Sequence, residues 1–309
     1  MTFPASPPLV ATPVRRVLHR VLGPLLPYLL HLRPMEWPVM TAHAALGWLL
    51  AGGFREPDAG AWLGLAAWVV CLNGGTLALN SAFDRDTGDV AYLRSPPPPP
   101  PGLAIGALLL MLAGLWLTWA LPPTYRLLYG VSIILSIAYS VPPVRLKAVA
   151  GADWIINMVG FGTLTPWAGW AITGRTLTLS EGLVLWAFCP LFAALYPLTQ
   201  LYQMDEDRAR GDRTLVLRLG IDRALAVAIA AAGVAFLMLA GAAWLQGWSN
   251  GGPLRWAALG AAALGWLAVL VPWHQHGREW AMAEHQRGMY HALVAWELTD
   301  AAVLIAWLA

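Results

Sequence analysis

The chain alternates between long apolar stretches and short polar connections. Nine stretches of roughly 17–25 residues carry little or no charge, which is the length that crosses a bilayer as an α-helix. They are apolar on all sides and lack the polar stripe of a soluble amphipathic helix. We therefore predict an all-α protein with nine transmembrane helices, at residues 37–53, 60–83, 103–121, 125–141, 154–173, 181–203, 222–246, 254–273 and 289–308.

The composition agrees with a membrane location. Of the 309 residues, 58% are hydrophobic and 12% are charged, which is about half the charged fraction of an ordinary soluble domain. The net charge of +2 is too small to indicate nucleic-acid binding. The two cysteines, Cys71 and Cys189, fall within predicted spans, so nothing indicates a disulfide framework. These features predict an integral, multi-pass protein whose surroundings are the lipid bilayer.

Residues 1–36 precede the first predicted span and are interpreted as a tail with an interfacial segment. The basic residues Arg15, Arg16 and Arg20 come before a stretch that prolines interrupt. This order differs from that of a cleavable signal peptide and favours a helix that lies at the membrane surface. Residues 37–309 are predicted to form a single transmembrane domain.

The distribution of basic residues predicts the orientation of the chain. If the N-terminus is cytoplasmic, fifteen Lys and Arg residues fall on cytoplasmic segments. The other side then holds only four, Arg55, Arg126, Arg175 and Arg255. Because short cytoplasmic loops carry an excess of Lys and Arg, the N-terminus and the acidic segments are predicted to be cytoplasmic.

Two copies of one polar pattern occur at the ends of predicted spans. Residues 80–89 read NSAFDRDTGD and residues 203–212 read QMDEDRARGD, so that each has an amide, then Asp-Arg, then Gly-Asp. The copies stand four spans apart, which makes the repeat parallel, with halves at about 37–150 and 151–288 and a ninth helix outside the repeat. We expect the two motifs to face each other across a cavity that opens to the cytoplasm.

The residue types in these motifs indicate a magnesium and phosphate site. An amide and an aspartate four residues apart share one helical face, and hard oxygen ligands suit Mg²⁺, whose coordination substrate phosphates usually complete. Basic side chains nearby can contact phosphate oxygens. The candidate metal ligands are Asn80, Asp84, Asp86, Asp89, Gln203, Asp205 and Asp207, with Glu206 and Asp212 as further carboxylates. The candidate diphosphate contacts are Arg85, Arg94, Arg145, Lys147 and Arg208.

An acidic stretch at the end of a helix also has a simpler interpretation. Such residues are often solvated, and Gly88 and Gly211 are ordinary candidates for helix C-caps. One motif alone would leave both interpretations open. Two copies in matching positions favour a binding site.

Other polar residues in the apolar segments carry weaker signals. Asp153 and Asn157, four residues apart at the start of the fifth span, either line the cavity or form a packing hydrogen bond. Asp300 and Glu297 fall within the ninth span, where an isolated charge is costly; we expect them near the outer interface or protonated. The histidines at 274, 276 and 285 are interpreted as part of a solvated loop.

Three segments give the chain a family resemblance. They are YSVPPVRLK at 139–147, EDRARGDRTL at 206–215 and the Leu219-Gly220 pair, in that order. With the two acidic motifs they resemble the UbiA superfamily of intramembrane prenyltransferases, in particular its chlorophyll-synthase-like branch. The first acidic motif departs from the family pattern because Gly88 stands where an aspartate is usual. The second departs because Gln203 takes the first place, with Asp205 as a substitute.

The resemblance implies a fold, a cofactor and an activity. It implies nine transmembrane helices, two Mg²⁺ ions held by the acidic motifs, and an isoprenyl diphosphate as donor. Asp84, Asp207 and Tyr139 are then the candidate catalytic residues. The implied reaction transfers an isoprenyl group to a hydrophobic acceptor, which is an aromatic compound, a quinone precursor, a tetrapyrrole or a lipid, and releases diphosphate.

Two alternatives remain open on the same residues. A membrane terpene cyclase would use the same donor and the same acidic motifs without an external acceptor. A secondary transporter also has parallel repeats, but its charged residues usually lie near the membrane midplane. The acidic motifs here are predicted at the mouth of the cavity, which favours an enzyme.

Overall fold

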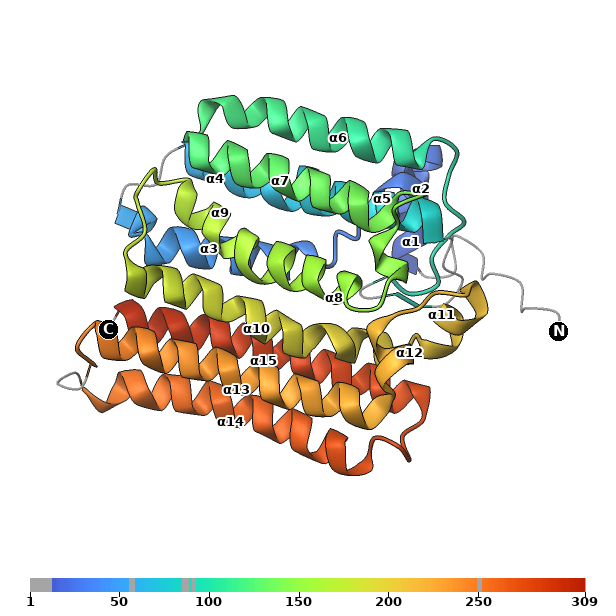
Figure 1. Cartoon of the computed structure of the whole chain (residues 1–309). Helices are drawn as coiled ribbons and strands as arrows, with labels where there is room; N and C mark the ends of the chain where they lie inside the picture. The colour runs from blue at the N-terminus through green and yellow to red at the C-terminus, as the bar shows by residue number, and fades with distance from the viewer. Residues whose placement is uncertain (1–12, 56–58, 85–88, 91–92, 249–251, 309) are drawn as a thin grey trace.

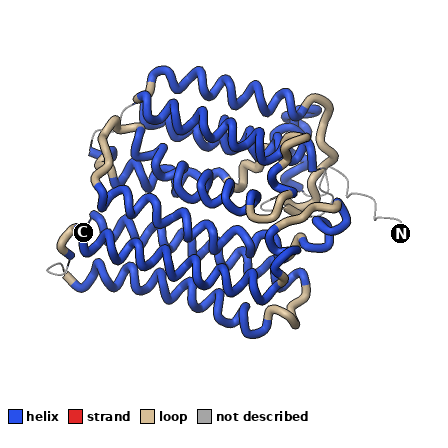
Figure 2. Tube along the Cα trace, viewed as in Figure 1, coloured by secondary structure: helices blue, strands red, loops and turns tan. Residues whose placement is uncertain are grey.

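The structure is a computed structural model of the chain that describes residues 13–55, 59–84, 89–90, 93–248 and 252–308. Its secondary structure is helical, and the described residues form no strand beyond two isolated bridges (Figures 1 and 2). The first half of the chain contains α1 (Pro13–Leu22), α2 (Leu26–His31), α3 (Trp37–Leu50), α4 (Ala59–Ala66), α5 (Gly74–Asp84), α6 (Leu103–Leu117), α7 (Pro123–Ser140), α8 (Ala152–Asn157) and α9 (Thr165–Ala171). The second half contains α10 (Leu179–Leu201), α11 (Met204–Arg210), α12 (Leu215–Leu219), α13 (Ile221–Leu245), α14 (Pro253–His276) and α15 (Met282–Leu308).

Short helical pieces join some of these helices. Two π-helical segments continue the chain without a break, η3 (Ala67–Asn73) between α4 and α5 and η6 (Met158–Leu164) between α8 and α9. Single π-turns within helices are frequent at functional sites. The 3-10 turns are η1 (Gly23–Leu25), η2 (Gly53–Arg55), η4 (Thr118–Ala120) and η5 (Leu146–Ala148).

Several helices have the length and composition of membrane spans. Within the described residues, six are long and apolar enough to cross a membrane: Ala59–Asp84, Leu103–Ala120, Leu179–Leu201, Ile221–Leu245, Pro253–His276 and Met282–Leu308. The spans predicted at 37–53, 125–141 and 154–173 coincide with helical segments that are shorter or less apolar. The prediction of an all-helical membrane protein is therefore confirmed, whereas the number of nine spans stays a prediction.

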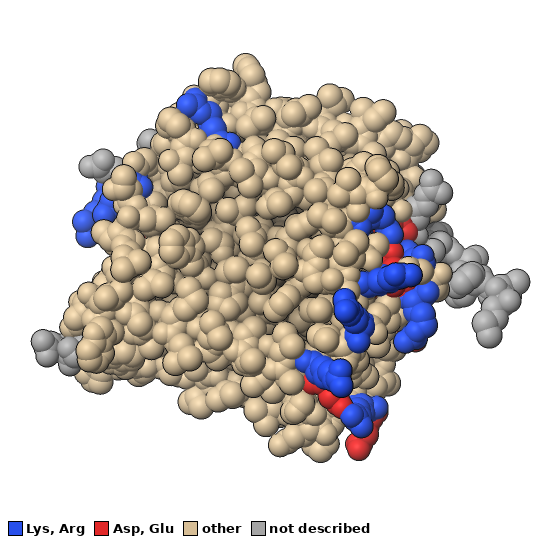
Figure 3. Space-filling view, in the orientation of Figure 1, with Lys and Arg blue, Asp and Glu red and all other residues tan. Residues whose placement is uncertain are grey.

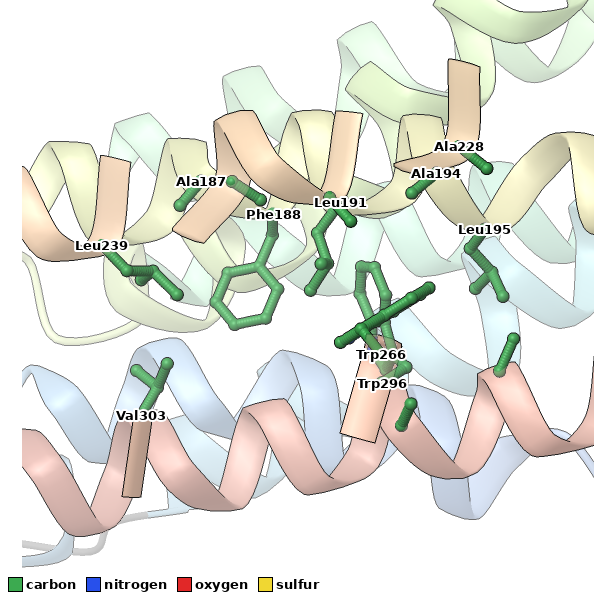
Figure 4. Close-up of a cluster of buried hydrophobic side chains, with 14 of the residues drawn as sticks. Ala187, Phe188, Leu191, Ala194, Leu195, Ala228, Leu239, Trp266, Trp296 and Val303 are labelled. Atoms are coloured by element: carbon green, nitrogen blue, oxygen red, sulfur yellow. The ribbon is translucent and has the colours of Figure 1, made fainter. Parts of the chain in front are cut away.

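The helices lie roughly parallel and build two apolar cores (Figure 1). One core joins α3 to α4, α5, α6, α7 and α9, and the other joins α10, α13, α14 and α15 with part of α3. Figure 4 shows the second core, in which Phe188 and Leu191 of α10 point toward Trp296 and Val303 of α15. Burying large aromatic side chains of this kind contributes strongly to packing inside the bundle.

Glycines allow α3 and α9 to approach closely between the two cores. A Cβ atom on Gly47 would lie 1.7 Å from the carbonyl oxygen of Pro166, and one on Gly169 would lie 1.8 Å from that of Ala44. Small residues at helix contacts let backbones come together in this way in membrane proteins. The contact holds α3 directly against α9.

Charged side chains gather at the ends of the bundle. Figure 3 shows acidic and basic residues together at the end where α11 and α12 lie, and basic residues alone at the opposite end. Between the two ends, the visible face carries no charged side chain. This band is the surface expected of a protein that contacts lipid chains.

Candidate active site

A cavity of about 270 Å³ lies between the two cores and is lined by residues of both acidic motifs. The first motif contributes Asn80 and Asp84 from the end of α5, and the second contributes Gln203 and Asp207 at α11. Most of the remaining lining is apolar or aromatic. The cavity therefore combines polar groups at the charged end of the bundle with an apolar interior.

Asp84, the last residue of α5, is buried and paired with basic side chains from the loop after α7. Lys147 donates a hydrogen bond to the carboxylate of Asp84 and lies 3.4 Å from the side-chain oxygen of Asn80. The Nη2 atom of Arg145 lies 3.3 Å from Oδ1 of Asp84. With an exposure of only 7%, Asp84 depends on these partners to balance its charge in a dry environment.

The backbone at Arg145 is unusual. Its φ angle is +31°, in the left-handed region that residues other than glycine seldom adopt. Arg145 stands at the start of the turn η5 in this conformation, and its guanidinium contacts the carboxylates of Asp84 and Asp212. Backbone strain that the surroundings maintain is often found at functional sites.

The second motif places Asp207 on α11, with 4% of its surface exposed. Arg210, one turn later, forms an ion pair with Asp207 and also donates from Nε to Asp212 at 3.1 Å. Burial raises the pKa of Asp207 to about 6, although Arg210 and Lys147 act in the opposite direction. Asp212 is also desolvated, but hydrogen bonds from Arg145 and Arg210 outweigh this effect and hold its pKa below the usual value.

A network of ion pairs connects the two motifs across the cavity. Arg145 bridges them, because its Nη1 atom lies 2.5 Å from Oδ1 of Asp212 while Nη2 contacts Asp84. The positive charge of Lys147 acts on Asp207 as well as on Asp84. Acidic residues from distant parts of the sequence thus share one set of cations, which is the arrangement needed to receive a bound anion between them.

Polar residues of α7, α8 and α10 continue the lining away from the ion pairs. The hydroxyl groups of Tyr139 and Tyr196 lie 2.9 Å apart, and Asn157 also lines the cavity. Asp153 has a different position, since its carboxylate accepts bonds from Gln200 Nε2 at 2.7 Å and from the backbone of Leu215 at 3.0 Å. Of the two interpretations left open by the sequence, cavity lining fits Asn157 and packing fits Asp153.

The other candidate residues lie outside the cavity lining. Arg208 and Asp205 form an exposed ion pair at 2.9 Å on the surface of α11. Arg94 is exposed, and Asp89 accepts a bond from the backbone of Ser95 at 2.8 Å. Asp89 lines a second, neighbouring pocket together with Gln203 and Glu206. The remaining two candidates, Arg85 and Asp86, lie outside the described residues.

The donor set of the cavity fits Mg²⁺ only in part. The carboxylates of Asp84 and Asp207 and the amide oxygens of Asn80 and Gln203 are hard oxygen ligands. However, the described residues contain no group of three acidic, histidine or cysteine side chains arranged to hold a metal by themselves. Such a set suits an ion that shares its coordination with substrate phosphates.

Several residues of the site were not identified from the sequence. The pairing of Arg210 with Asp207 and Asp212 could have been suspected from their spacing within the second motif. Glu36 also lines the cavity at the start of α3, and burial raises its pKa to about 7 in spite of the nearby Arg33. No pattern around Glu36 distinguished it from an ordinary residue before a span.

The structure gives polar residues of the last helices partners that local spacing did not reveal. Asp300 is 3% exposed and pairs with His43 of α3, while its expected place near the outer interface or its protonation stays a prediction. His285 belongs to α15 and not to a solvated loop, and it accepts a hydrogen bond from Trp273 at 3.0 Å. Long-range partners of this kind cannot be read from local spacing.

Comparison with known proteins agrees with the motifs. The model of the UbiA prenyltransferase family matches residues 37–294. The chain belongs to this family. It is 28% identical to chlorophyll synthase of Oryza sativa subsp. japonica over 235 residues, which cover 68% of this chain and 59% of the plant protein. The chain therefore matches about three fifths of the length of that relative.

Solved structures share the fold. A UbiA homologue from Archaeoglobus fulgidus, bound to DMAPP and Mg²⁺, superimposes with a TM-score of 0.62 at 18% identity, covering 88% of this chain and 98% of the other. A digeranylgeranylglyceryl phosphate synthase gives a TM-score of 0.67 at 13% identity, covering 92% and 98%. These similarities establish the architecture of UbiA proteins for this chain.

Proposed function

We propose that this UbiA family member transfers an isoprenyl group from an isoprenyl diphosphate to a hydrophobic acceptor and releases diphosphate. The observation that carries the proposal is that Asp84 and Asp207, from two distant motifs, line one cavity and share the cations of Arg145 and Lys147. A diphosphate would bind at this charged end, and its hydrocarbon chain would occupy the apolar interior. The Archaeoglobus fulgidus homologue bound to DMAPP and Mg²⁺ supports this choice of donor.

In this proposal the side chains of the charged end bind and orient the donor. Lys147 and Arg145 contact phosphate oxygens and stabilise the charge that develops as diphosphate departs. Asn80, Asp84, Gln203 and Asp207 would hold Mg²⁺, which would supply further stabilisation of the leaving group when bound. The hydroxyl pair of Tyr139 and Tyr196 stands beside this region.

The apolar interior protects the reaction from water. Its aromatic lining includes Trp68, Phe192 and Trp296, whose ring faces can stabilise a developing allylic cation. The bond between the isoprenyl carbon and the diphosphate oxygen breaks, a bond to the acceptor forms, and the proton of the acceptor passes to the released diphosphate. Water excluded from the cavity cannot compete as the acceptor.

The membrane arrangement forms part of the proposal. We place nine spans in the bilayer, with residues 37–309 as one domain and the two motifs in related halves. The excess of basic residues at the predicted cytoplasmic segments supports a cytoplasmic mouth for the cavity.

The activity is tested with purified protein in lipid nanodiscs. The protein is incubated with Mg²⁺, a C10, C15 or C20 prenyl diphosphate and a lipid extract, and the products are identified by mass spectrometry. Release of diphosphate with a prenylated acceptor supports the proposal. A cyclised hydrocarbon as the only product would identify a terpene cyclase, and no Mg²⁺-dependent release with any donor would contradict both enzyme assignments.

A further inference from the structure

His43 of α3 lines the cavity, and one of its ring nitrogens has no hydrogen-bond partner within the described part of the chain. The side chain is 2% exposed, and its Nδ1 atom lies 3.1 Å from both carboxylate oxygens of Asp300 on α15. Because a carboxylate accepts hydrogen bonds, this contact places the proton of the neutral ring on Nδ1. The Nε2 atom then has a lone pair, and it is buried without a hydrogen-bond partner among the described residues.

Asn73 lines the same cavity and holds a second polar group without a hydrogen-bond partner among the described residues. It is the last residue of the π-helical segment η3 and is 3% exposed. Neither its amide oxygen nor its amide nitrogen has a partner in the described part of the chain. Since η3 packs against α3, Asn73 and His43 belong to neighbouring walls of the cavity.

These groups lie in the apolar part of the cavity, away from the ion pairs of the two acidic motifs. Asn73 precedes α5, whose 11 residues separate it from Asp84 by about 16 Å along the helix. The rings of Phe188 and Trp296 contact His43 edge-on, with centroids at 4.9 Å and 4.7 Å. Buried polar groups are almost always hydrogen-bonded, so two unpaired ones on residues that line a cavity indicate a site for a polar ligand group.

We propose that Asn73 and His43 form a subsite that binds a hydroxyl or carboxyl group of the acceptor. This inference rests on the proposed transfer reaction, in which the donor offers only a diphosphate at the charged end and a hydrocarbon chain. Such a chain has no hydrogen-bond donor, so the acceptor is the substrate that can use these groups. The Nε2 atom of His43 accepts the proton of the acceptor's O–H, while the Asn73 amide binds its oxygen. The acceptor is therefore a hydrophobic molecule with a protic oxygen.

The subsite is tested by the binding of two probes that differ in one hydrogen-bond donor. The probes are 2-naphthol and 2-methoxynaphthalene, and the affinity of the full chain in nanodiscs is measured for each. The ratio of the two affinities is then compared between variants. Partition of the probes into lipid is the same for every variant, so it cancels in this comparison. Loss of one hydrogen bond corresponds to about a tenfold change in affinity. His43→Phe and Asn73→Leu are each expected to reduce the preference for 2-naphthol by about tenfold.

A matched control uses the same helix as Asp300. His291 of α15 is exposed and is not among the residues that line the cavity, so His291→Phe is expected to keep the wild-type ratio. A measurement on the unaltered chain covers the case in which a variant does not fold. The ¹⁵N resonance of His43 Nε2 is expected to shift with 2-naphthol and not with 2-methoxynaphthalene.

The outcomes separate this inference from the proposed reaction. Equal effects of the two probes on the His43 resonance, or an unchanged ratio in both subsite variants, would overturn the subsite even if the chain transfers isoprenyl groups. A chain that shows the expected ratios but does not release diphosphate would keep the subsite and contradict the reaction. Asp84→Ala is expected to keep the ratio while losing turnover, because Asp84 lies at the other end of the cavity.

Discussion

Lys147 and Asp84 form a buried ion pair that joins the loop after α7 to the end of α5. The pair lies on the lining of the cavity, beside Asn80 and within the electrostatic reach of Asp207. A cation already positioned against a motif aspartate can contact an arriving phosphate without crossing the cavity. This geometry leads to a set of predictions for single substitutions.

Substitution of either motif aspartate should stop turnover. Asp84→Ala and Asp207→Ala each remove a hard oxygen ligand from a different wall of the cavity, so each is expected to lower kcat by about a hundredfold or more. The measurement is Mg²⁺-dependent release of diphosphate by protein that elutes as a single species in detergent. Near-normal activity in either variant would contradict the shared site. The exposed Asp205→Ala is the matched control on α11 and should keep most of the activity.

Lys147→Ala should affect the donor more than the acceptor. The side chain contacts Asp84 and Asn80 at the charged end, where the diphosphate is proposed to bind. Its loss is expected to raise the KM for the prenyl diphosphate several-fold more than the KM for the acceptor. Steady-state kinetics with each substrate varied in turn measures both constants. Equal changes would show that Lys147 supports the loop and does not bind phosphate.

The metal-free protein should lose stability as the pH rises toward neutrality. Burial raises the pKa of Asp207 from 3.8 to about 6, so the folded state binds a proton more tightly than the unfolded chain does. The contribution of Asp207 to the free energy of unfolding is therefore greatest below about pH 4. It falls by about 3 kcal/mol as the pH rises through 6. The pKa of Asp212 is lowered in the folded protein, so its stabilising contribution has the opposite pH dependence. That contribution is lost only as the pH falls below 3.8.

Asp207→Asn is the variant that tests this pH dependence. It keeps the shape of the side chain and removes the titrating proton, so its melting temperature should vary less between pH 4 and pH 7. At pH 7 the variant should melt above the wild type when chelator is present. The same slope in both proteins would show that another group causes the pH dependence.

The glycine contact between α3 and α9 should tolerate no side chain. Gly47→Ala would bring a Cβ to 1.7 Å from the Pro166 carbonyl oxygen, and the backbones would have to separate. We expect a loss of stability of about 1–3 kcal/mol, the usual cost of overpacking. Gly106→Ala on α6 meets nothing within 4 Å and should be neutral or slightly stabilising. Thermal unfolding in detergent compares the two, and equal melting temperatures would contradict the close contact.

The sequence predicted the helical membrane fold and the family because both depend on local patterns. Long apolar runs indicate spans, and the spacing of Asn80 and Asp84 places both on one helical face, as the cavity lining shows. Contacts between residues far apart in the sequence could not be predicted from these local patterns. The pairing of His43 with Asp300 joins α3 to α15 (Figure 1), and no local pattern relates the two.

The position of single residues within the motifs also depended on tertiary structure. Asp205 and Asp207 are two residues apart on a short helix, so that one is exposed and the other faces the cavity. The sequence could not distinguish them because the family pattern is altered at Gln203. The packing of α11 against the rest of the bundle places Asp207 on the cavity lining and leaves Asp205 exposed.

The central claim is that the two acidic motifs form one site for an isoprenyl diphosphate. It is tested most directly by an experimental structure of the full chain with Mg²⁺ and farnesyl thiolodiphosphate, a donor analogue that reacts slowly. The account predicts that metal ions join the diphosphate to Asp84 on one side and to Asp207 on the other, with Lys147 in contact with a phosphate oxygen. A diphosphate bound to one motif alone, or at a place remote from both aspartates, would contradict it.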